Sequence, residues 1–291
     1  MFPQAGRDGW GTRIGQGRLA CLAMDAHLTD SADSGLPLTG ERTVPGLAQE
    51  NYWFRRHEVA YLRCVDICAG QEVLEAGCGE GYGADLIASV ARRVVAVDYD
   101  AATVEHVRAR YPRVQVLAAN LAAVPMPDEA VDVVVNFQVI EHLWDQPQFI
   151  TECLRLLRPG GRLLMSTPNR ITFTPGSDTP VNPFHTRELN AAELRELLED
   201  GGFEVEGMYG VFHGPRLAEM DARHGGSIID AQIARALTDT PWPADLLADV
   251  AAVRCEDFEI VDETARDIND VAAAARDIND SLDLLAIAVR P

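Results

Sequence analysis

Four alternating glycines follow an apolar segment early in the chain and form the first group of residues that could do chemistry. The segment 73–76 reads Val-Leu-Glu-Ala, and glycines stand at positions 77, 79, 81 and 83. A loop with so little side chain lets the backbone turn sharply and lets a ligand approach its N–H groups. A helix expected at 84–90 points its N-terminus, with unpaired donors and a partial positive charge, at the same place. The pattern predicts a site for a nucleotide-like ligand with an anionic or carboxylate group.

An acidic residue ends the next apolar segment. The run 93–98 reads Arg-Val-Val-Ala-Val-Asp, which places Asp98 about 20 residues beyond the glycine loop. An acid at the carboxyl end of a strand in this position accepts hydrogen bonds from the hydroxyls of a ribose. The alternative is a solvated aspartate at a strand end. Because the glycine loop precedes it, we expect Asp98 to bind a ribose.

The other apolar segments predict the elements that position these groups. Strands are expected at 73–76, 93–98, 114–120, 131–140, 162–169, 203–212 and 282–289. Helices are expected at 52–68, 84–90, 101–111, 148–157 and 189–198, and a turn at 158–161. Strands that alternate with helices predict an α/β fold with a mostly parallel sheet. In such sheets ligands bind beyond the carboxyl ends of the strands, where the glycine loop and Asp98 would lie.

The glycine loop itself distinguishes two classes of nucleotide ligand. The pattern Gly79-x-Gly81-x-x-Ala84 fits the dinucleotide template, which is a weak match on its own. However, Glu75 precedes the loop and Gly77 lengthens it. The pattern Glu-x-Gly-x-Gly-x-Gly, followed by a strand ending in aspartate, resembles the class I S-adenosylmethionine-dependent methyltransferases. The run Leu-Arg-Pro-Gly-Gly at 157–161 also resembles this family. The resemblance implies a Rossmann-like, seven-stranded, mostly parallel sheet flanked by helices.

The resemblance implies S-adenosylmethionine as cofactor and methyl donor, with S-adenosylhomocysteine as product. It assigns donor contacts to Glu75, Gly77, Gly79, Gly81, Asp98, Tyr99, Asn120, Leu121 and Gln138. Asn120 would face the adenine amino group, although an asparagine that caps a turn fits the same position. In the aromatic and basic cluster at 50–58, we expect Tyr52, Arg56 or His57 to contact the methionine carboxylate or the acceptor. The alternative is a docking helix with its arginines in water.

Histidine and carboxylate side chains are the candidate catalytic groups. Glu141 and His142 follow the central strand, and His185 lies in a long proline-containing loop at 170–186. An alcohol is almost fully protonated at neutral pH and so reacts faster beside a positioned general base. We expect His142 to be that base, Glu141 to orient it or contact the donor, and His185 to be the second candidate. Either histidine could instead only pack or hold its loop.

A metal centre is allowed but not favoured by the sequence. Glu141, His142 and Asp145 could contribute ligands to a divalent cation, as some relatives acting on hydroxyls require. Their spacing matches no strong metal-binding pattern. We therefore assign no metal ligands.

The composition excludes several classes of partner. The net charge of −20 argues against a nucleic acid, whose phosphates require positive charge. No segment is long and apolar enough to insert in a membrane, and the first residues do not read as a secretory signal. The six cysteines lack metal-ligand pairs, and those at 64 and 68 lie in an apolar helical run. This pattern favours packed thiols and a reducing cytoplasm.

The domain organisation follows from shifts in pattern. Residues 1–38 are polar and aperiodic, which predicts a disordered or extended tail. A methyltransferase core is expected at 39–212, with its last strand in 282–291. The insertion 213–281 is expected to hold helices at 215–224, 228–237 and 244–253 and to serve as a lid or a homodimer contact. Within it, Ala-Arg-Asp-Ile-Asn-Asp occurs at 265–270 and 275–280, which indicates a local duplication that we expect to be exposed and mobile.

Several longer runs resemble a narrower group, the actinobacterial methyltransferases associated with methylglucose lipopolysaccharide synthesis. They lie at 50–57, 74–87, 136–145, 182–189 and 221–232. The resemblance covers roughly residues 38 to 291 and implies a cytoplasmic enzyme that methylates a glucose 6-hydroxyl of an α-glucan-like oligosaccharide. Four aromatic residues could stack on sugar rings, although such residues more often belong to a core: Trp53, Trp144, Tyr209 and Trp242.

Three other readings of the sequence stay open. The same chemistry could act on a small molecule such as a phenol or quinone precursor, which an apolar aromatic acceptor pocket would favour. A non-catalytic protein could bind the donor for regulation or assembly. A nicotinamide-dependent oxidoreductase is the least favoured reading.

Overall fold

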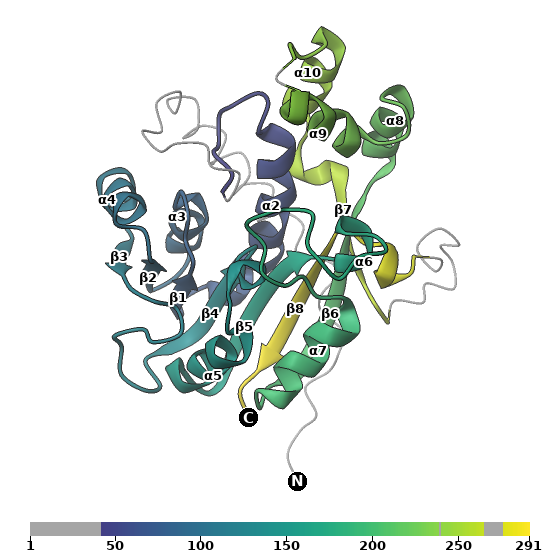
Figure 1. Cartoon of the computed structure of the whole chain (residues 1–291). Coiled ribbons are helices and arrows are strands. Elements are labelled where there is room, and N and C mark those ends of the chain that lie inside the picture. The colour runs from purple at the N-terminus through teal and green to yellow at the C-terminus, as the bar shows by residue number, and fades with distance from the viewer. Residues whose placement is uncertain (1–41, 239, 265–275) are drawn as a thin grey trace.

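The computed structural model describes residues 42–238, 240–264 and 276–291 (Figure 1). The expected tail at 1–38 and the first copy of the duplicated hexapeptide lie outside these residues. Eight strands form one sheet in the order β3-β2-β1-β4-β5-β8-β6-β7. The strands are β1 (Glu72–Ala76), β2 (Arg93–Asp98), β3 (Gln115–Ala118), β4 (Val131–Phe137), β5 (Leu157–Pro168), β6 (Glu204–His213), β7 (Phe258–Asp262) and β8 (Asp283–Val289). Strands β1 to β5 are parallel, and β8 is antiparallel to both β5 and β6.

The expected sheet was wrong in two places. An eighth strand, β7, pairs antiparallel with β6 at the sheet edge; it is only five residues long and lies in the insertion, where only helices were expected. The expected turn at 158–161 is instead part of β5, which begins at Leu157. Here Gly160 donates to Arg290 O over 2.8 Å and Gly161 O accepts from Arg290 N over 2.9 Å, so the end of the chain pairs with this segment.

Helices cover both faces of the sheet (Figure 1). They are α2 (Asn51–Cys64), α3 (Tyr82–Ala88), α4 (Ala101–Arg110), α5 (Gln146–Leu156), α6 (Arg170–Phe173), α7 (Ala191–Asp200), α8 (Pro215–Arg223), α9 (Ile228–Thr238) and α10 (Ala244–Ala251). Helices α2, α3 and α4 pack on one face, and α5 and α7 on the other. Because side chains alternate along a strand, Val94 and Ala96 of β2 join the first core while Val95 and Val97 join the second.

The three expected helices between β6 and β8 are present as α8, α9 and α10. They share a third core with the start of α2, built from residues such as Tyr52, Leu217, Ile228 and Leu246. A buried hydrogen-bond chain adds to this packing, since the Tyr52 hydroxyl lies 2.7 Å from His213 Nε2 and His213 Nδ1 lies 2.7 Å from Asp221. Figure 1 shows the three helices grouped beyond the upper end of α2.

Several further predictions from the sequence concern a helix cap, the cysteines, the repeated hexapeptide and membrane-spanning helices. Asn190 and Glu193 form the expected capping box at the start of α7. The five cysteines in the described part of the chain are buried and form no disulfides. The second hexapeptide copy, described from Arg276, contains a 3₁₀ helix (Ile278–Asp280) whose carbonyls accept bonds from the Asn169 amide. Among the helices described, none is long and apolar enough to cross a membrane.

Candidate active site

A cavity of about 980 Å³ opens at the carboxyl ends of the parallel strands. Its walls come from the loops after β1, β2, β3 and β4, from the segment 183–186, and from residues in and before α2. This is the location at which α/β sheets bind ligands, and the volume suits a nucleoside together with a second small molecule. Among the described residues, no part of the insertion 213–281 lines the cavity, so its role as a lid or dimer contact stays a prediction.

The glycine loop after β1 forms one wall of this cavity through Gly77 and Gly79. Gly77 has a φ of +87°, and a Cβ placed there would lie 2.6 Å from Val139 Cγ1. The backbone N–H groups of Gly77 and Cys78 both donate to Val97 O, at 2.8 and 3.1 Å. The loop is therefore tied to β2, and Gly77 lets it pass close beneath the loop that follows β4. Gly81 lies away from the cavity, where its Cβ would meet Val107 and Tyr111 of α4 and the turn beyond it.

Asp98 connects the glycine loop with the end of β2. Its carboxylate accepts hydrogen bonds from the Gly79 N–H over 3.1 Å and from the Asp100 N–H over 3.0 Å. The side chain also lines the cavity. Burial raises the pKa of Asp98, while these two N–H groups act in the opposite direction. The residue thus holds the loop and presents carboxylate oxygen to the cavity, as a ribose-binding acid must.

The remaining expected donor residues on the cavity wall are Tyr99, Asn120, Leu121 and Gln138. Tyr99 is exposed. Asn120 Oδ1 accepts from the Ala122 N–H over 2.9 Å, so this residue caps its turn while also facing the cavity. Gln138 is one of two non-glycine residues of the described chain with positive φ, at +57°, and its N–H donates to Ser166 O over 2.9 Å. Such strained backbone is often found at ligand sites.

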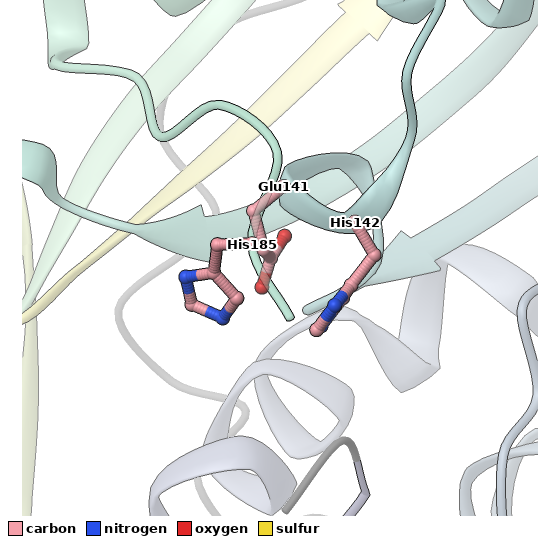
Figure 2. A group of neighbouring side chains, drawn as sticks. All are labelled: Glu141, His142 and His185. Carbon is pink, nitrogen blue, oxygen red and sulfur yellow. The ribbon is translucent and has the colours of Figure 1, made fainter. Parts of the chain in front are cut away.

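Figure 2 shows the three expected catalytic residues close together, and two of them, His142 and His185, line the cavity. Glu141 and His142 end the 3₁₀ helix η2 (Ile140–His142), and His185 comes from the loop 174–190. One candidate ligand atom from each residue, a carboxylate oxygen or an imidazole nitrogen, lies within 4.8 Å of the other two. The loop is held to η2 because the Thr186 N–H donates to Glu141 O over 2.7 Å. Glu141 is buried, and burial raises the pKa of its carboxyl group to about 8.

The hydrogen bonds of the two histidines determine where their protons lie. His142 Nδ1 is 3.0 Å from the Phe184 carbonyl, which can only accept, so Nδ1 carries the hydrogen. His185 Nδ1 lies 2.7 Å from the Glu188 carboxylate, and its Nε2 lies 3.0 Å from Asn182 Nδ2. Since Asn182 Oδ1 accepts from the Phe184 N–H, its NH₂ group faces Nε2. Nδ1 therefore carries a hydrogen in both rings, and Nε2 of His185 accepts from the Asn182 amide.

Comparison with known proteins identifies the family to which this chain belongs. A model described as a methyltransferase domain matches residues 74–165. A Mycolicibacterium smegmatis protein named "Probable S-adenosylmethionine-dependent methyltransferase" is 71% identical over 258 residues, which cover 89% of this chain and 96% of that protein. The chain belongs to the S-adenosylmethionine-dependent methyltransferases. A Mycobacterium tuberculosis protein of the same description is 66% identical to this methyltransferase over 256 residues, 88% of this chain and 90% of that protein.

A solved structure confirms the fold of the methyltransferase. It is a Thermotoga maritima protein described as an S-adenosylmethionine-dependent methyltransferase and possible histamine N-methyltransferase, with a TM-score of 0.54. The match covers 82% of this chain and 93% of that one at 16% identity, a level that shows the fold alone. The expected Rossmann-like sheet and the expected cofactor, S-adenosylmethionine, are thus confirmed at the level of the family.

Two expected donor residues of the methyltransferase lie behind the cavity wall. Arg56 is buried and bonds both oxygens of Asp283, at 2.6 and 2.7 Å, which ties α2 to β8. The structure thus places its guanidinium neither in the cavity nor in water. Glu75 is also buried, and its carboxyl accepts from the Tyr61 hydroxyl over 2.6 Å. Burial raises the pKa of Glu75 to about 8. Direct donor contacts by these two residues stay predictions.

His57 is the member of the aromatic and basic cluster that lines the cavity. Burial lowers its pKa to about 4, so its ring is neutral at physiological pH. The lining residues that sequence reasoning missed include Arg42, Thr43 and Glu80. Arg42 donates to Thr103 over 2.7 Å and lies 3.5 Å from Asp100, which brings the segment before α2 to the part of the cavity near Asp98. No motif marks Arg42 or Thr43, whereas Glu80 lies inside the glycine loop and could have been found there.

Proposed function

We propose that this methyltransferase methylates a sugar hydroxyl, the 6-hydroxyl of a glucose in an α-glucan precursor of a methylglucose polysaccharide. The observation that carries the proposal is the pair of adjacent imidazoles, His142 and His185, whose ring centres lie 4.8 Å apart on the cavity wall. An alcohol needs such a group, because its proton must leave as the new bond forms. The resemblance of the runs 136–145 and 182–189 to the methylglucose-associated methyltransferases supports the choice of a sugar.

Side chains at the rim of the cavity also suit a carbohydrate. Trp144 is 93% exposed and Phe184 is 43% exposed, and both line the cavity beside His142. Exposed aromatic faces can pack on sugar rings, while the histidines and Asp145 supply polar contacts. The other expected stacking residues, Trp53, Tyr209 and Trp242, pack against the cores instead. A small phenol or quinone precursor is the alternative acceptor, and the nearby Phe137 and Phe149 are the apolar wall that would favour it.

The residues of the chain fit the proposed reaction. S-adenosylmethionine supplies a methyl group on a sulfonium, which is its own leaving group. The glycine loop and Asp98 bind the donor, and the sheet-end loops bring the acceptor hydroxyl into line with it. His142 Nε2 takes the hydroxyl proton as the oxygen–carbon bond forms and the sulfur–carbon bond breaks. His185 is the second candidate for this role, and the Glu141 carboxylate lies between the two rings (Figure 2).

Replacing His142 tests whether its side chain acts as the general base or only supports the structure. We expect His142→Ala to bind S-adenosylmethionine as the parent does and to lower turnover about 10²- to 10⁴-fold, because a general base contributes that much. His142→Asn is the matched variant, because its amide can still donate to Phe184 O but has no basic nitrogen. Calorimetry would measure donor binding, and single-turnover assays would measure methyl transfer. Unchanged turnover in His142→Ala, or rescue by asparagine, would remove His142 as the base.

The acceptor is tested by methyl transfer to short α-1,4-glucan oligosaccharides, read by mass spectrometry with the methylated position mapped. The expected result is donor-dependent addition of one methyl group to glucose O6. Transfer to phenolic precursors but not to glucans would favour the alternative acceptor. Tight donor binding without transfer to either class would support a non-catalytic role.

A further inference from the structure

We propose that Glu141, His142 and His185 form a binding site for one divalent transition-metal ion. Sequence reasoning considered Glu141 and His142 with Asp145, but the Asp145 side chain caps α5 by accepting from the Gln148 N–H over 3.0 Å. The structure brings in His185 instead, from 43 residues further along the chain. Figure 2 shows the Glu141 carboxylate between the two imidazole rings, with one nitrogen of His185 turned toward them. The rings lie 4.8 Å apart and nearly perpendicular.

The hydrogen bonds around this cluster are those of metal-binding histidines. A histidine that ligates a metal through one nitrogen almost always donates its other N–H to a carbonyl or carboxylate, which fixes the tautomer and orients the ring. His142 does so to Phe184 O, and His185 does so to the buried Glu188. Glu141 accepts from the Thr167 hydroxyl over 3.1 Å, which orients the third ligand. All three side chains thus have the outer partners that a metal site requires.

The ligand set indicates the class of metal. Two imidazoles and one carboxylate bind zinc in catalytic sites that keep a position open, and bind other first-row ions in similar sites. At zinc–nitrogen distances near 2.1 Å, ligand atoms lie about 3.4 Å apart, so the cluster must contract from its present span. Binding also requires the Asn182 amide to give up its contact with His185 Nε2. Both changes are confined to the side chains and the loop that carries Asn182 and His185.

The ion's role in the reaction rests on the proposed function, whereas its binding does not. An ion held by both imidazoles would take over from His142 as the group that activates the acceptor. A coordinated hydroxyl has a lower pKa than a free one, so its proton can pass to water before or during methyl transfer. Both histidines line the cavity, so an ion held by them would be accessible to an acceptor bound there.

The test uses the full-length chain without an affinity tag, equilibrated with Zn²⁺ or with Co²⁺ as a coloured probe. We expect about one ion per chain after gel filtration, and a visible Co²⁺ absorption typical of nitrogen ligands. Glu141→Gln and His185→Gln should each weaken binding more than 10-fold, and Glu188→Gln about 10- to 100-fold, because it removes only an outer partner. His224→Gln is the control, since His224 pairs with Asp249 over 2.8 Å outside the cavity.

Circular dichroism would show that each variant folds, and Glu188→Gln provides a milder change should the buried Glu141 be needed for folding. An absence of saturable binding, or equal binding by the parent and the cluster variants, would overturn the proposal. Because donor and acceptor are absent from the measurement, this outcome is distinct from failure of the sugar assay. The reverse result, metal binding without glucan methylation, would support the metal site and argue against a glucan as the acceptor.

Discussion

Asp98→Ala is expected to weaken the binding of S-adenosylmethionine about 100-fold. A hydrogen bond to a charged group contributes about 1.5–3 kcal/mol, and a ribose offers two hydroxyls to this carboxylate. The change also frees the Gly79 N–H, which Asp98 holds at 3.1 Å, and so loosens the glycine loop. Both effects weaken the binding of S-adenosylmethionine. Titration calorimetry of the purified protein with S-adenosylmethionine gives the dissociation constant directly.

The matched control for this change is Asp85→Ala. Asp85 belongs to α3, directly after the glycine loop, but its carboxylate pairs with Arg113 at 2.6 Å and does not line the cavity. Its removal should leave the dissociation constant within about threefold of the parent. If Asp98→Ala behaved like this control while remaining folded, the ribose would have to be bound elsewhere in the cavity.

The donor half of the site could be predicted because its parts follow one another along the chain. Strand β1, the glycine loop, α3 and β2 occupy consecutive residues, so Asp98 reaches the loop without any knowledge of distant packing. The prediction of the acceptor half relied instead on a general rule about parallel sheets. The loops after β4 and β5 leave the same edge of a parallel sheet, which was enough to expect His142 and His185 near one another.

Other features depend on contacts that no local pattern encodes. The partner that sets the His142 tautomer, the Phe184 carbonyl, lies 42 residues further along the chain and reaches the ring because its loop folds back on η2. Strand β7 was missed because five residues between helices carry too little alternation to be read as a strand. Arg56 was expected at the ligand because it lies in a basic cluster, and its partner, Asp283, stands 227 residues away.

Breaking the buried pair formed by Arg56 and Asp283 is expected to have the largest effect on stability. Their side chains are 3% and 2% exposed, and the guanidinium also donates to Leu282 O over 2.9 Å. Arg56→Leu would leave the Asp283 carboxylate buried without its partner, which costs about 3–5 kcal/mol in the free energy of unfolding. Urea unfolding followed by circular dichroism at neutral pH would measure this loss. Because His57 is the next residue of α2, the same change should also disturb the cavity wall.

Two further variants identify the cause of that loss. Arg162 and Glu206 form an ion pair on the surface, with side chains 42% and 45% exposed, so Arg162→Leu should cost less than about 1 kcal/mol. The double change Arg56→Leu with Asp283→Leu removes both buried charges and should recover much of the stability lost by Arg56→Leu alone, because the unpaired carboxylate is gone. If the double variant were no more stable than Arg56→Leu, the loss would come from packing of α2 rather than from charge. Recovery would instead show that Arg56 and Asp283 lock α2 onto the last strand, and so fix the helix that carries His57 to the cavity.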